Sequence, residues 1–83
     1  MNEPIVTIDL HGFRMEEAQA RIEEAVKKAG PWTYRIRCIH GYHGGTAIRT
    51  MIRREFGYGL EPKVKRIVPG DNEGITELIL REY

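Results

Sequence analysis

The 83-residue sequence predicts a single α/β domain, a two-layer α+β sandwich in which two helices cover one face of a four-stranded mixed sheet. Short β-branched runs alternate with amphipathic runs in the order β-α-β-α-β-β, and glycine- or proline-rich turns separate them. The chain is also too short to bury a second core. We therefore expect one domain over residues 1–83, with its core in residues 5–83.

Residues 5–10 form the first predicted strand, because β-branched residues dominate this run and Gly12 follows it. Residues 14–29 form the first predicted helix, which ends at Gly30 and Pro31. Its apolar residues recur at spacings of three and four, which predicts one buried stripe: Met15, Ala18, Ile22, Ala25, Val26 and Ala29.

The second half of the chain supplies one more helix and three more strands. Residues 34–40 form the second predicted strand, and residues 64–68 and 75–80 form the third and fourth. Residues 46–56 form the second helix, with a predicted buried stripe of Ile48, Met51, Ile52 and Phe56. Right-handed crossovers place both helices on one face, so the other face is expected to stay partly open.

Composition excludes several classes of protein. The chain is 41% hydrophobic and 30% charged, which is typical of a soluble globular domain. Its single cysteine, Cys38, excludes an internal disulfide and fits a reducing compartment. The sequence has neither an apolar run of about 20 residues, as a membrane span needs, nor the features of a signal peptide. We expect a cytoplasmic protein away from the membrane, and the oligomeric state stays open.

Charge is distributed unevenly along the chain. Residues 35–66 carry eight basic and two acidic residues, although the net charge of the whole chain is only +1. Residues 1–34 and 67–83 are both net acidic. A basic block of this kind is typical of a surface that binds a polyanion, and an unevenly charged solvated surface is the alternative.

Two short motifs follow the first two predicted strands. Residues 40–46 read His-Gly-Tyr-His-Gly-Gly-Thr and open the second helix; residues 9–12 read Asp-Leu-His-Gly. A glycine-rich turn before a helix presents free N–H groups and the positive end of the helix dipole, which together favour phosphate. Ligands of open α/β sheets bind at the carboxyl ends of strands. We therefore expect Asp9, His11 and His40 to meet near the start of the second helix.

Asp9, His11 and His40 are the candidate catalytic residues. Asp9 is suited to bind Mg²⁺, activate water or orient His11, and capping the turn at Gly12 is the structural alternative. His11 is suited to general acid–base catalysis, and His40 to stabilising charge on a phosphate. Loop packing is the alternative for both histidines. The sequence has neither a Cys-x-x-Cys pair nor a helical His-x-x-x-His spacing to support a zinc site, so it favours Mg²⁺ at Asp9 over zinc.

The candidate nucleic-acid-binding residues are of two kinds. Glycines supply backbone N–H groups, and the residues among and beyond them supply aromatic or positively charged side chains that contact bases or phosphates. The set is Gly12, Gly41, Tyr42, His43, Gly44, Gly45, Arg35, Arg37, Arg49 and Arg53.

These motifs resemble those of the Smr (small MutS-related) domain. Residues 8–12, Ile-Asp-Leu-His-Gly, look like its leucine-aspartate-leucine-histidine-glycine motif, and residues 39–41 with 47–49 look like its second motif. Residues 74–78 resemble its closing glycine-alanine-threonine strand, so the resemblance covers nearly the whole chain. It implies the fold of the C-terminal domain of translation initiation factor three, nucleic-acid binding, and in many members DNA nicking or RNA cleavage.

One departure from the family pattern affects function. His43 stands where the family usually has glycine, and the loop is one residue longer than the common form. Three classes of function therefore stay open: an endonuclease for DNA or RNA, a non-catalytic module that binds nucleic acid or the ribosome, and a protein-interaction domain. The chemistry of residues 9–12 and 40–46 favours the endonuclease.

Overall fold

A computed structural model describes residues 3–41 and 46–82. Its elements are β1 (Ile5–Asp9), α1 (Met15–Lys28), β2 (Arg35–Ile39), α2 (Ala47–Phe56), β3 (Arg66–Pro69) and β4 (Ile75–Ile79). The sheet has the order β1-β2-β4-β3. β1 pairs in parallel with β2, whereas β4 is antiparallel to both β2 and β3. The predicted four-stranded mixed sheet is confirmed.

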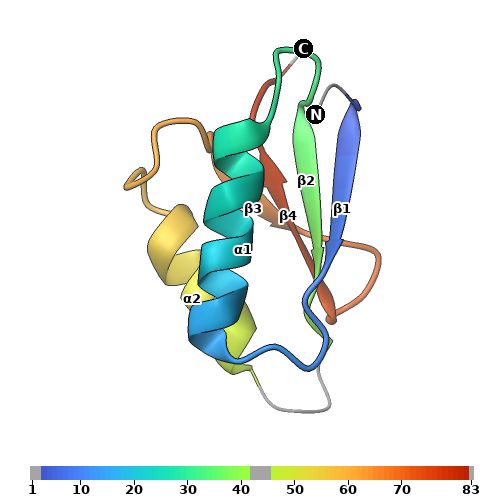
Figure 1. Ribbon diagram of the computed structural model, residues 1–83, viewed down its shortest axis with the longest axis vertical. Helices are drawn as coiled ribbons and strands as arrows, with labels where there is room; N and C mark the ends of the chain where they lie inside the picture. The colour runs from blue at the N-terminus through green and yellow to red at the C-terminus, as the bar shows by residue number, and fades with distance from the viewer. Residues whose placement is uncertain (1–2, 42–45, 83) are drawn as a thin grey trace.

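Both helices cover the same face of this sheet (Figure 1). The connections from β1 to β2 and from β2 to β3 step across the sheet in the same direction. Two such crossovers of the same hand bring both helices to one side. The turn after β1 and the end of β2 lie together at one end of the domain, and the start of β1 lies at the other (Figure 1).

The hydrophobic core fills the space between helices and sheet. The largest buried apolar side chains come from every layer: Leu10, Ile22, Val26, Ile36, Met51, Ile52 and Leu78. The predicted helical stripes are largely confirmed, but Met15 is exposed and Ala29 and Ile48 are only partly buried. Met15 is the first residue of α1, and the buried residues of this helix begin at Ala18.

The element ends explain the other small differences from prediction. The carboxylate of Glu17 accepts a hydrogen bond from the Arg14 N–H, 3.0 Å away, and closes the start of α1. β3 begins at Arg66 rather than at residue 64, because the Val64 N–H bonds back to the Glu61 carbonyl in a turn. Neither α1 nor α2 has the length and apolarity that a helix needs to cross a bilayer.

Candidate functional site

The first motif forms a tight turn at the end of β1. Leu10 is buried and anchors the turn, so Asp9 and His11 on either side of it are exposed. The Asp9 carboxylate accepts a hydrogen bond from the His11 backbone N–H at 2.9 Å. Gly12 follows with φ +82°, a backbone conformation that residues with a Cβ rarely adopt. The predicted turn-capping role of Asp9 is therefore present in the structure.

The second motif is anchored to the loop between β3 and β4. The N–H groups of His40 and Gly41 both donate to the Gly74 carbonyl, at 2.9 and 3.0 Å. Gly41 has φ +75°, a backbone conformation that residues with a Cβ rarely adopt. The backbone at the end of β2 is thus held by the loop before β4.

The two motifs lie against one another. β1 and β2 are parallel neighbours, and the Leu10 N–H donates to the Ile39 carbonyl at 2.7 Å just beyond the paired residues. A Cβ on Gly41 would lie 3.7 Å from Cδ2 of His11, so the His11 ring borders the Gly41 backbone. The parallel pairing of β1 with β2 is what brings the motifs together.

His40 lies beneath this surface rather than on it. The Nδ1–H of His40 donates a hydrogen bond to the carbonyl of Gly41 at 2.7 Å. Its Nε2 lies 2.8 Å from the Thr76 hydroxyl, which donates a hydrogen bond to Nε2 when the ring is neutral. Burial lowers the pKa of His40, the Gly41 hydrogen bond opposes this shift, and the charge of Arg49 adds to it. Both ring nitrogens are therefore engaged within the chain, and the neutral ring is favoured.

Arg49 and Arg53 border a groove beside the second motif. They are four residues apart on α2 and so share one side of the helix. Across from them lie the end of β3, the β3–β4 loop and the start of β4, and the enclosed space is about 430 Å³. Within residues 3–41 and 46–82, neither guanidinium has a hydrogen-bond or ion-pair partner. Two of the predicted phosphate-binding arginines are thus available to a ligand.

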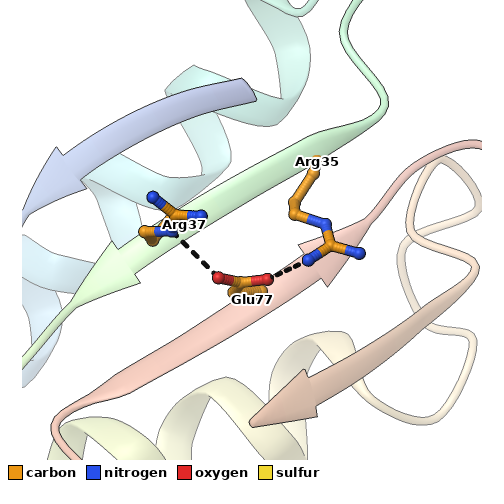
Figure 2. A network of polar contacts seen from close by, with 3 residues as sticks. All are labelled: Arg35, Arg37 and Glu77. Atoms are coloured by element: carbon orange, nitrogen blue, oxygen red, sulfur yellow. Dashed lines mark hydrogen bonds and ion pairs between the residues drawn. The ribbon is translucent and has the colours of Figure 1, made fainter. Parts of the chain in front are cut away.

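Arg35 and Arg37 lie on the open face of the sheet, as predicted, but both are paired. Figure 2 shows them on β2 on either side of Glu77 of β4. Arg37 Nε donates to one Glu77 carboxylate oxygen at 2.9 Å, and Arg35 donates to the other. Arg35 also lies over the Tyr34 ring, 5.6 Å from its centroid. The buried carboxylate cancels part of the positive charge that the sequence places here.

Two predictions remain: the binding residues of the glycine-rich loop and the metal site at Asp9. Tyr42, His43, Gly44 and Gly45 lie outside the described residues. In the part of the chain that the structure does describe, no three histidine, cysteine or acidic side chains gather as a metal site would require.

Sequence reasoning assigned no role to Thr76 and Glu77, which the structure places under His40 and between the two arginines of the open face. Thr76 belongs to the segment that resembles the family's closing strand, and that resemblance was the available indication. Glu77 is an acidic residue in an apolar strand, and such a residue is seldom buried without a partner. Its partners became identifiable only with the strand register.

Comparison with known proteins identifies the fold. No protein-family model and no curated protein matches the chain. Among solved structures, the crystal structure of the Smr domain of Thermus thermophilus MutS2 superposes with a TM-score of 0.80 and 24% sequence identity. The match covers 93% of this chain and 99% of that chain. The chain therefore has the Smr fold that its motifs predict.

Proposed function

We propose that this chain is a nucleic-acid-binding domain of the Smr type that cleaves a phosphodiester bond of DNA or RNA. The observation that carries the proposal is the contact between the two motifs, in which the His11 ring borders Gly41 at the paired ends of β1 and β2. Arg49, whose guanidinium has no partner among residues 3–41 and 46–82, lies on the first turn of the next helix. An exposed imidazole and such a guanidinium beside a glycine turn suit a bound phosphate.

The three candidate catalytic residues take different parts in this proposal. Phosphodiester hydrolysis needs a group that moves a proton to or from the oxygens at phosphorus, and the exposed His11 supplies it. Asp9 holds the His11 backbone through one carboxylate oxygen. Its other oxygen suits a Mg²⁺ ion, which takes one or two protein carboxylates and completes its shell with water and phosphate. His40 is a positioning residue, since both its ring nitrogens hold the chain around Gly41.

A nicking assay tests the catalytic part of the proposal. Supercoiled plasmid and a structured RNA are incubated with the wild-type chain, with and without Mg²⁺, and with Asp9→Asn and His11→Ala. Glu16→Gln, which changes an exposed carboxylate on α1, is the control for Asp9→Asn. We expect cleavage by the wild type and the control, and a loss of about 100-fold or more in His11→Ala, as for removal of an acid–base group. Equal cleavage by all four chains would refute these roles.

Binding without cleavage is the second candidate. The observation that favours it is that His40, one of the three candidate catalytic residues, has no free ring nitrogen. Binding to a labelled polynucleotide is measured across a series of salt concentrations, because an affinity that falls steeply with salt indicates phosphate contacts. Salt-dependent binding with no cleavage of either substrate would select this candidate. The absence of such binding would exclude both candidates.

A further inference from the structure

The groove beside α2 combines two kinds of wall. Arg49 and Arg53 supply positive charge from the helix. The opposite side is mainly apolar near β3 and polar in the loop, and its lining residues are Ile67, Val68, Pro69, Gly70, Asn72, Glu73, Ile75 and Thr76. Its volume of about 430 Å³ is within the range of small-ligand sites. A ligand that matches it carries an anionic group next to a largely apolar group.

The groove is continuous with the candidate site. Thr76 lines it and also bonds the His40 ring, and Arg49 lines it and lowers the pKa of His40. The β3–β4 loop that forms its far wall also accepts the N–H groups of the second motif through Gly74. A strand with its phosphate at the paired motifs therefore has a neighbouring nucleotide within reach of the groove.

We propose that this groove receives one unpaired nucleotide of the bound strand. The base packs on the apolar wall formed by Ile67 and Pro69, which share the helix-covered face of the sheet, and the adjoining phosphates bind Arg49 and Arg53. Glu73, the acidic residue of the lining, stands on the wall opposite the arginines, so the base rather than a phosphate faces it. This inference rests on the proposed function and adds a substrate class to it: nucleic acid with an extrahelical or single-stranded base, since a stacked base cannot enter such a pocket.

The binding test compares a fully paired duplex with the same duplex carrying one bulged nucleotide. Wild type, Arg53→Gln and the control Arg54→Gln are titrated with each by fluorescence anisotropy at one salt concentration. Arg54 is the next residue on α2, lies outside the groove and is paired with Glu55. We expect Arg53→Gln to weaken binding of the bulged duplex about tenfold, the equivalent of about 1.4 kcal/mol. We expect it to weaken binding of the paired duplex by a smaller factor, because that duplex loses a phosphate contact but places no base in the groove.

An NMR titration tests the position of the base directly. Deoxyadenosine monophosphate and inorganic phosphate are added separately to the ¹⁵N-labelled chain. We expect amide shifts at residues 67, 68, 70 and 72–76 with the nucleotide, and shifts only near the arginines with phosphate. Identical shift patterns for the two ligands would overturn the assignment of the base to the groove.

The outcomes separate the two proposals. Tight, salt-sensitive binding of both duplexes without a preference for the bulge would overturn the groove inference and leave the proposed function standing. No binding of either duplex would overturn both. A preference for the bulge that Arg53→Gln and Arg54→Gln reduce equally would also overturn the groove inference, because charge alone would then explain the effect.

Discussion

Replacing Glu77 by glutamine isolates the contribution of the buried carboxylate on the open sheet face. The Glu77 side chain is only 4% exposed and accepts hydrogen bonds from two guanidinium groups (Figure 2). Glutamine has nearly the same size, but it keeps one acceptor oxygen and replaces the other with an NH₂ group. One guanidinium would then face a donor, and the other would bond a neutral oxygen instead of a charged one.

The expected cost follows from the burial of the acceptor and the exposure of its partners. A hydrogen bond to a charged group contributes about 1.5–3 kcal/mol. Because the arginine side chains are 34% and 32% exposed, water compensates part of what they lose. We expect Glu77→Gln to lower the free energy of unfolding by about 2 kcal/mol, which is a fall in Tm of about 8–16 °C for a domain of this size.

A matched control separates this effect from the loss of any ion pair. Glu82 also pairs with an arginine, Arg66, but their side chains are 53% and 57% exposed. Such surface pairs contribute about 0–1 kcal/mol, so Glu82→Gln should barely change Tm. The assay is thermal unfolding followed by circular dichroism. A Tm of Glu77→Gln within about 4 °C of the control, or about 1 kcal/mol, would refute the reasoning.

Three further predictions concern single side chains. Because the folded pKa of His40 is lowered, the unfolded chain binds the proton more tightly. The free energy of unfolding, measured by urea titration, should thus fall as the pH drops below 6.5, and it should fall more steeply in the wild type than in His40→Gln. Equal dependence on pH in the two chains would contradict the lowered pKa of His40. Lys63 Nζ donates a hydrogen bond to the Val26 carbonyl at the end of α1. Lys63→Met should therefore lower the free energy of unfolding by about 1 kcal/mol in the same assay. An unchanged urea midpoint would show that this hydrogen bond does not stabilise the helix end. Burial raises the pKa of Cys38 to about 12, so iodoacetamide should alkylate it only in denaturant; alkylation of the native chain would contradict its burial.

Much of the fold was predictable because hydrophobic periodicity reports burial directly. The alternation in residues 34–40 correctly places Ile36 and Cys38 in the core and Arg35 and Arg37 on the opposite face. Strand order was not predictable in the same way. Pairing of β2 with both β1 and β4 depends on contacts between residues far apart in the chain, and local pattern does not encode them.

The candidate site was predictable in its residue types but not in its arrangement. The spacing of Asp9, His11 and Gly12 indicates a polar turn after a buried strand, and the structure contains that turn. The burial of His40 could not be inferred, because it depends on Thr76 from a strand 36 residues away. A histidine beside a glycine turn is equally compatible with an exposed and a buried ring.

The structure also locates the positive charge that the sequence only counts. Most of the eight basic residues in the block 35–66 have a partner in the described chain: Arg35 and Arg37 with Glu77, Arg54 with Glu55, Lys63 with the end of α1, and Arg66 with Glu82. Arg49, Arg53 and Lys65 have none among the described residues, and of these three Arg49 and Arg53 face the groove beside the second motif. A polyanion gains most where positive charge is not already neutralised. We therefore expect the phosphates to bind at α2 and the paired motifs rather than on the open face of the sheet.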